Sequence, residues 1–454
     1  MPESIDPTTG ETVATYEVDD DATVVAAIET AHQRHLEWRT TSFATRADHL
    51  HRVADALDER RDELAALMAA EMGKPVTGGR GEVDKCAWVC RWYADNAAGH
   101  LADEPLVSDH DESFIHYEPL GVVLAVMPWN FPLWQVFRFA APALMAGNGG
   151  LLKHASNVTG CAIAIQELIE AGGVPEGLFR TLILESSRVD MVLEHPLVRA
   201  ATLTGSGPAG SAVAAKAGEL LKPTVLELGG SDPYVVLEDA DLDLAAAICA
   251  KGRIMNGGQS CIAAKRFIVV DAVHDEFVAK VTAQLESFVV GDPSDEGTDM
   301  GPMARVDLRD ELHDQVERTI AAGATLVLGG EVPDGPGAFY PVTLLPDVTQ
   351  GMPGHDEETF GPIAVVVRAA DEADAVEIAN DTPFGLGAAV FTADLDRGRR
   401  IAAEQLDAGC CFVNAQVASD PRLPFGGIKE SGYGRELSHL GIREFVNAKT
   451  VAVH

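Results

Sequence analysis

Short apolar runs alternate with amphipathic segments from residue 119 to about residue 415, and this alternation limits the fold more than any other feature of the chain. The first series, up to residue 230, contains the runs GVVLAVM, GLLKHA, FRTLIL, AATLTG and TVLELGG, which we predict to be strands. The second series, from residue 232, contains PYVVLE, RFIVVD, ATLVLGG, GPIAVVVRA, GAAVFT and CCFVNA. Because strands that alternate with helices form parallel sheets covered by helices on both faces, the sequence predicts two α/β domains in tandem.

The segments outside the two α/β series contain long helices and two lone strands. Residues 20–100 have apolar residues at helical spacing, which predicts long helices. A polar, β-like stretch follows within residues 106–121, and the C-terminal segment, residues 431–454, ends in NAKTVAVH. Lone strands of this kind often pair outside their own domain, which favours a homodimer or homotetramer.

Composition excludes several classes of protein. A chain of 454 residues with 46% hydrophobic residues can build more than one core. No apolar run approaches the roughly 20 residues that cross a bilayer, and the N-terminus lacks a signal pattern, so we expect a cytoplasmic protein. The formal net charge of −36 repels nucleic acids and anionic membranes. So acidic a surface also favours a halophilic organism, where salt screens the self-repulsion.

The seven cysteines are scattered and odd in number, which argues against a disulfide framework. Cys86 and Cys90 lie one helical turn apart but have no second pair of ligands nearby. Since a structural zinc ion needs four converging nitrogen or sulfur ligands, we expect no metal site.

Three residues beside element boundaries form a candidate set for covalent catalysis. Cys261 lies in NGGQSCIAAKR, although a free cysteine alone is commonly a buried filler. Glu227 lies in VLELGGSDP at the carboxyl end of a predicted strand, where ligands bind in open α/β sheets, although an isolated acid there can be incidental. Asn130 lies between two prolines in PWNFP, which stiffen its loop. A thiol, a carboxylate and a fixed amide donor together are typical of nucleophilic catalysis.

A glycine motif indicates a nucleotide site. Gly205, Gly207 and Gly210 form G-x-G-x-x-G between a predicted strand and a predicted helix, which allows a helix N-terminus to approach a pyrophosphate. Earlier strands precede this unit, whereas the dinucleotide fingerprint belongs on the first strand. Glu227, about twenty residues further on, is therefore either the ribose-binding acid of that fingerprint or a catalytic group.

Eight motifs along nearly the whole chain resemble the NAD(P)-dependent aldehyde dehydrogenase superfamily, in the family's order. They are MPWNFP, LLKHASN, LTGS, LELGGSDP, NGGQSCIAAKRF, EETFGP, NDTPFGL and PFGGIKESGYGRE. The stretches LLKHASNVTGCA, ELGGSDPYVVLEDADLD and CIAAKRFIV resemble the succinate-semialdehyde dehydrogenase branch in particular.

The resemblance implies a mechanism and a domain plan. Cys261 would attack the aldehyde carbonyl, Asn130 would stabilise the oxyanion, and Glu227 would activate the water that hydrolyses the thioester. It further implies the following domain plan: a Rossmann-like cofactor-binding domain from residues 1–105 and 122–229, a catalytic domain from residues 230–430, and an oligomerisation element from residues 106–121 and 431–454.

The cofactor implied by the resemblance is NADP or NAD. The residues that match cofactor-binding positions of the family are Trp129, Lys153, Ser156, Gly205, Ser206, Glu358 and Phe360. Family members that carry Glu at the position of Ser156 would repel a 2′-phosphate, and serine avoids that repulsion.

Arg138 is the residue that the resemblance assigns to the distal carboxylate of a semialdehyde acid. The chain departs from some of those enzymes at Met255, where a second Arg is found, and at Asp420, where a Ser is found. Arg253 or Arg422 could compensate. The plain alternative for Arg138 is an ion pair on a helix surface.

Three other functions stay open at this point. The enzyme could oxidise another aldehyde, or it could be a CoA-acylating semialdehyde dehydrogenase, against which a water-activating Glu227 argues. A non-catalytic protein with the same fold is the third. Ala263, two residues after Cys261, removes the second thiol that a disulfide switch at the site would need.

Overall fold

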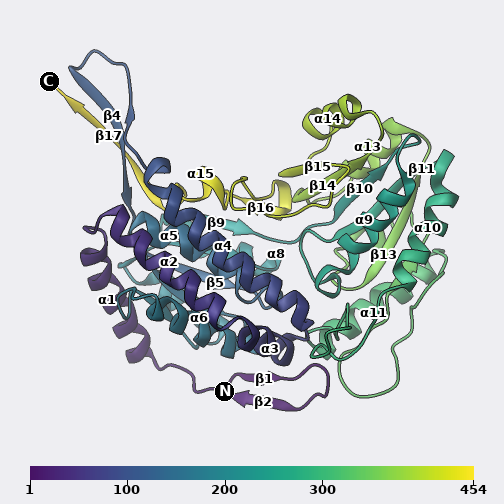
Figure 1. The fold of residues 1–454 in the computed structure, drawn as a ribbon, viewed down its shortest axis with the longest axis horizontal. Coiled ribbons are helices and arrows are strands. Elements are labelled where there is room, and N and C mark those ends of the chain that lie inside the picture. Colours follow the sequence, from purple (N-terminus) through teal and green to yellow (C-terminus); the bar gives the residue numbers. More distant parts are fainter.

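The computed structural model describes residues 1–454 and contains two six-stranded sheets in separate lobes (Figure 1). The first lobe holds the long N-terminal helices, and the second holds the middle of the chain, drawn in green in Figure 1. The α/β fold with two parallel sheets that the sequence predicts is confirmed.

The first sheet has the strand order β16-β9-β8-β5-β6-β7. Its parallel strands are β5 (Val122–Met127), β6 (Gly149–His154), β7 (Phe179–Thr181), β8 (Val198–Thr204) and β9 (Thr224–Glu227), and β16 (Gly432–Tyr433) is antiparallel to β9. Its helices are α1 (Asp21–Trp38), α2 (Phe43–Glu59), α3 (Arg61–Met72), α4 (Val76–His100), α5 (Trp134–Ala146), α6 (Thr159–Ala171), α7 (Val189–Glu194) and α8 (Gly207–Glu219).

Side chains of β5 alternate between the two faces of this sheet. Val123 and Ala125 belong to the core formed with α2, α4, α5 and α6, whereas Val122 and Leu124 belong to the core formed with α1, α7 and α8. A strand buried on both faces must be apolar throughout, which is why β5 reads as one continuous hydrophobic run.

The second sheet is parallel throughout, with the strand order β12-β13-β11-β10-β14-β15. Its strands are β10 (Asp232–Val236), β11 (Ala264–Val270), β12 (Thr343–Leu345), β13 (Ile363–Ala369), β14 (Gly387–Phe391) and β15 (Cys410–Val413). Its helices are α9 (Leu242–Ile254), α10 (His274–Glu286), α11 (Val306–Ala321), α12 (Pro353–Asp356), α13 (Glu372–Asn380) and α14 (Leu395–Glu404).

One predicted strand of this sheet is wrong. The run ATLVLGG forms no strand, and only Leu328 makes an isolated bridge, to Leu344 of β12. Gly329 and Gly330 follow at φ of 69° and 86°, a left-handed conformation that turns the chain away before a strand can form. The edge of the sheet is instead β12, which the sequence analysis did not predict.

The two predicted lone strands pair with each other. β17 (Val446–Val453) is antiparallel to β4 (Glu112–Pro119) along the full length of both, and β3 (Glu104–Pro105) joins the other edge of β4. Figure 1 shows β4 and β17 as a ribbon that projects from the first lobe.

Several small elements complete the fold. They are the hairpin of β1 (Glu3–Ile5) and β2 (Thr12–Thr15), helix α15 (Ser438–Gly441), and the 3-10 turns η1 (Ser156–Val158), η2 (Ser186–Arg188), η3 (Met255–Gly258), η4 (Asp271–Val273) and η5 (Lys429–Ser431). None of the helices has both the length and the apolar character needed to cross a membrane.

Candidate active site

The first sheet changes direction between β5 and β8, since β6 and β7 extend it on one side and β8 and β9 on the other. Open α/β sheets bind ligands at the carboxyl ends of their strands beside such a switch point. The predicted residues at those strand ends are Trp129 and Asn130 after β5, Lys153 in β6, Gly205 and Ser206 after β8, and Glu227 at the end of β9. Topology therefore brings six of the predicted site residues to one edge of this sheet.

Cys261 and Glu358 come from the other lobe, where they precede strands β11 and β13. Buried Lys265 ties this region together, because its Nζ donates to the carbonyl of Gly230 at 2.5 Å, to the carbonyl of Cys261 at 2.8 Å and to Oε1 of Glu358 at 2.7 Å. Glu358 Oε1 also accepts from the Gly230 N–H at 3.0 Å. Lys265 was not among the predicted site residues, and its signal in the sequence is a lysine at the start of an apolar strand.

The surroundings of the Cys261 thiol favour its protonated form. Burial raises the pKa of Cys261 to about 12, although nearby Lys265 and Arg138 favour the thiolate. Formation of a bond to Cys261 must therefore be coupled to removal of the thiol proton.

The loop that carries Cys261 packs closely against the turn after β9. A Cβ on Gly230 would lie 2.7 Å from the Cys261 carbonyl oxygen, so only glycine allows this turn to approach the loop so closely.

Glu227 is buried, and neither of its carboxyl oxygens has a hydrogen-bond partner. Burial, reinforced by the nearby Glu436 carboxyl, raises the pKa of Glu227 to about 8, whereas Arg138 opposes this. A buried carboxyl without partners that titrates near neutrality has the property expected of a general base.

Asn130 is joined to the loop that leads to Cys261. Its side-chain N–H donates to the carbonyl of Gln259 at 3.1 Å, and the side chain of Asn256 donates to the Asn130 carbonyl at 2.8 Å. Asn256 has φ of 57°, a left-handed conformation that asparagine tolerates better than most residues. The Asn130 amide has a second N–H, which forms no hydrogen bond with another residue.

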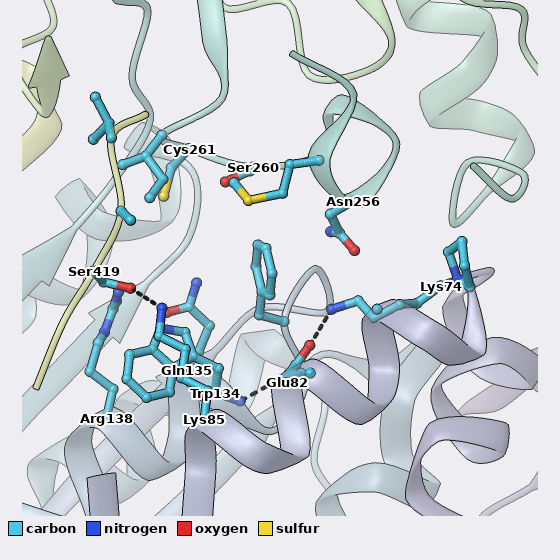
Figure 2. A pocket seen from close by; sticks show the side chains of 18 of the residues that line it. Lys74, Glu82, Lys85, Trp134, Gln135, Arg138, Asn256, Ser260, Cys261 and Ser419 are labelled. Carbon is cyan, nitrogen blue, oxygen red and sulfur yellow. Dashed lines mark hydrogen bonds and ion pairs between the residues drawn. The ribbon is translucent and has the colours of Figure 1, made fainter. Parts of the chain in front are cut away.

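Cys261 opens onto a cavity of about 340 Å³ between the lobes, shown in Figure 2. Cys261 and Ser260 lie on one side, and Lys85, Trp134, Gln135 and Arg138 project from α4 and α5 on the other. The cavity is at the lower end of the size range of small-molecule sites. Asn130 and Glu227 lie outside its lining.

Arg138 lines this cavity but is only 2% exposed, so the ion pair of the alternative reading exists but lies in the interior and not on a helix surface. Its Nε forms an ion pair with Glu436, and one terminal nitrogen donates to Thr204 Oγ1 at 3.3 Å. Glu436 lies almost three hundred residues away in the sequence, which is why no local pattern revealed the pairing.

Neither arginine suggested as a substitute lies in the cavity lining. Arg253 donates to the backbone carbonyls of Gly258, Thr359 and Gly361. Arg422 donates to both oxygens of Asp420, at 2.9 and 2.6 Å.

Lys153 and the glycines at the start of α8 make few contacts with the rest of the protein. Lys153 Nζ donates to Ser186 Oγ at 3.3 Å, has no carboxylate partner, and has a pKa lowered by burial. A Cβ atom added to Gly207 would have no other atom within 4 Å, whereas a Cβ atom added to Gly210 would lie 2.4 Å from the Leu228 side chain. The glycines nearest the start of α8 thus leave open space for a ligand, and Gly210 allows α8 to pack closely on the strand.

Two aromatic side chains close the other end of this region. The Trp129 and Phe360 rings meet edge to face with centroids 5.8 Å apart. The two lobes therefore contact each other where the resemblance places the nicotinamide end of the cofactor.

Comparisons with known proteins identify the family. The model of the aldehyde dehydrogenase family matches residues 2–451. The succinate-semialdehyde dehydrogenase [NADP(+)] of Mycobacterium avium is 53% identical over 99% of this chain and 96% of its own length, and the probable enzyme of that name from Synechocystis is 51% identical over 99% and 98%.

Solved structures agree with this match. The succinic semialdehyde dehydrogenase from Streptococcus pyogenes, in complex with NADP+, is 37% identical over all of both chains, with a TM-score of 0.97. Gox0499 is 40% identical over 100% of this chain and 99% of its own, with a TM-score of 0.98. The chain belongs to the aldehyde dehydrogenase family.

Proposed function

We propose that this enzyme oxidises succinate semialdehyde to succinate with NADP as the cofactor, through a thioester on Cys261. The observation that carries the proposal is the position of Cys261 on one wall of a cavity whose opposite wall carries the cations Lys85 and Arg138. The names of relatives at 53% and 51% identity support the same substrate and cofactor. The overall reaction converts the aldehyde, water and NADP+ into the carboxylate, NADPH and two protons.

Cys261 carries the first half of the reaction. Its sulfur forms a bond to the aldehyde carbon as the thiol proton passes to solvent, where it is one of the two protons released overall, and the second N–H of the Asn130 amide donates to the oxyanion that results. When bound, NADP supplies the acceptor for the hydride that leaves the same carbon. Loss of the hydride converts the adduct on Cys261 into a thioester.

Glu227 carries the second half. Once ionised, its carboxylate takes a proton from a water molecule that attacks the thioester carbon. The carboxylic acid leaves and the Cys261 thiol is restored. The raised pKa of Glu227, due chiefly to burial, makes it a stronger base than an exposed glutamate.

NADP fits the residues at the switch point. We assign Lys153 and Ser156 to the adenosine ribose and its 2′-phosphate, Gly205 and Ser206 to the pyrophosphate, and Trp129, Glu358 and Phe360 to the nicotinamide side. The support is that Lys153 is a buried cation without a carboxylate partner and Ser156 is an exposed neutral residue three positions on. An anionic phosphate would supply the negatively charged partner that this lysine lacks within the protein.

Ser156→Glu is expected to raise KM for NADP at least about 10-fold and to leave KM for NAD nearly unchanged, because only NADP brings a phosphate next to the new carboxylate. Initial rates with each cofactor in parallel measure the effect. Ser156→Gln is the matched control, since it adds the same bulk without the charge. Equal losses with both cofactors in the Glu variant would contradict this assignment.

The domain plan and the assembly belong to the same proposal. Residues 1–105 and 122–229 would bind the cofactor, residues 230–430 would carry catalysis, and residues 106–121 with 431–454 would join subunits into a homodimer or homotetramer. The projecting pair of β4 and β17 supports the last role, and seven free cysteines suit a cytoplasmic location. A mass in solution of a single 48.1 kDa chain would exclude the oligomer.

A substrate panel tests the proposed function. We expect kcat/KM with NADP to be highest for succinate semialdehyde, lower for pentanal, and independent of added CoA, with succinate as the product. A requirement for CoA would make the enzyme acyl-transferring, and a preference for pentanal would exclude the semialdehyde. The panel should be run at low and at molar salt, because the charge of −36 predicts that the fold benefits from screening.

A further inference from the structure

Three cationic side chains line the cavity in front of Cys261, and two of them already have a carboxylate partner. Lys74 forms an ion pair with Glu82, and Arg138 forms one with Glu436. Lys85 forms no ion pair. Its Nζ donates to Ser419 Oγ at 2.8 Å and lies 4.3 Å from the centroid of the Trp134 ring.

The acids nearest to Lys85 are engaged elsewhere. Glu82, one turn earlier on α4, accepts from Lys74 and from the backbone N–H groups of Leu133 and Trp134, at 2.8 and 2.9 Å. Asp420, next to Ser419, holds Arg422 with both of its oxygens. Lys85 therefore has no carboxylate in direct contact, although the more distant Glu82 and Asp420 favour its charged form.

A cation without a direct partner in a largely desolvated place is unfavourable unless a ligand compensates it. Burial, and secondarily the charge of Arg138, lowers the pKa of Lys85 to about 8. A carboxylate that entered the cavity would remove this penalty and restore a fully charged amine. Ser419 accepts the lysine N–H, so its own hydroxyl proton is free to serve as a second donor to the same anion.

We propose that Lys85, assisted by Ser419, binds the distal carboxylate of the semialdehyde and is the main determinant of specificity for an acidic aldehyde. The inference rests on the proposed function, in which the aldehyde end of the same molecule reacts at Cys261. Figure 2 shows Lys85 and Cys261 on opposite sides of the cavity, as a short chain with reactive groups at its two ends requires. Arg138, held by Glu436, adds positive potential, and the Trp134 ring lies beside the Lys85 ammonium group.

Lys85→Met tests the proposal, because methionine keeps the unbranched stem and removes the charge. We expect kcat/KM for succinate semialdehyde to fall at least about 30-fold, mainly through KM, because the contact is made equally before and during the reaction. The value for pentanal should change less than about threefold. Lys85→Arg should restore most of the preference, and Arg399→Met, which removes an exposed cation outside the cavity, should leave both values unchanged.

The outcomes separate the two proposals. If the wild-type enzyme prefers pentanal, both the proposed substrate and the role of Lys85 are wrong. If the wild type prefers succinate semialdehyde and Lys85→Met keeps that preference, only the role of Lys85 is wrong. Equal losses for both aldehydes in Lys85→Met also reject it, since they would indicate damage to the cavity and not to carboxylate binding. Thermal unfolding of each variant shows whether the fold is intact.

Discussion

Cys261→Ala is expected to lower aldehyde oxidation by roughly 10⁴-fold or more, because the substitution removes the only thiol that lines the cavity and with it the proposed covalent adduct. Hydride cannot leave an aldehyde carbon that has not first been converted into a tetrahedral adduct. The measurement is the initial rate of NADPH formation with succinate semialdehyde, together with the affinity for NADP, which should be close to that of the wild type.

Cys411→Ala is the matched control for this variant. Cys411 is a half-buried free thiol in β15, outside the cavity lining, and its loss should leave the rate nearly unchanged. Rapid acid quenching followed by mass spectrometry should locate an acyl group on the peptide that contains Cys261 in the wild type. An acyl group on another residue, or substantial activity of the alanine variant, would overturn the assigned nucleophile.

The elements that the sequence predicted well are those whose pattern is local. Strand β5 is apolar on both faces because helices cover it on both sides, and such a run can be recognised without tertiary information. ATLVLGG has the same appearance but ends in two left-handed glycines beside β12. Since the sheet completes its edge with β12 at Thr343–Leu345, a short strand in a loop-rich region, tertiary pairing decides this assignment.

The residues of the candidate site also fall into those with a local sequence signal and those without one. Cys261, Glu227 and Asn130 could be proposed from the sequence because each lies in a short motif at an element boundary, and the resemblance supplied their expected roles. The partners of charged residues are not local. The ion pair of Arg138 with Glu436 and the bonds of Lys265 to Gly230 and Glu358 join distant segments. Which cation stays unpaired in the cavity could therefore be read only from the three-dimensional structure.

Glu227→Gln is expected to release one rapid equivalent of NADPH per active site and then to reduce steady turnover by roughly 10²- to 10⁴-fold, because hydride transfer precedes the step that needs the base. Glutamine occupies the same space and stays neutral, so the cavity and the nucleophile are retained. Stopped-flow absorbance measures the burst and the steady rate in one trace. Steady turnover at the wild-type rate would assign the base to another group.

The pH dependence provides the control for this assignment. Burial, then the Glu436 carboxyl, raises the pKa of Glu227 above the ordinary value of 4.5, so the group is mainly neutral at pH 7 and gains its charge as the pH passes about 8. Steady turnover of the wild type should therefore rise between pH 6.5 and pH 9 if hydrolysis limits the rate, and the residual turnover of Glu227→Gln should lose this dependence.

The raised pKa of Glu227 also affects stability. The folded state binds the Glu227 proton more tightly than the unfolded state, so the contribution of Glu227 to stability is complete below pH 4.5 and is lost as the pH rises through about 8. Glu227→Gln should consequently unfold at a higher temperature than the wild type at pH 9, and a lower one there would contradict a carboxyl that is buried without a partner.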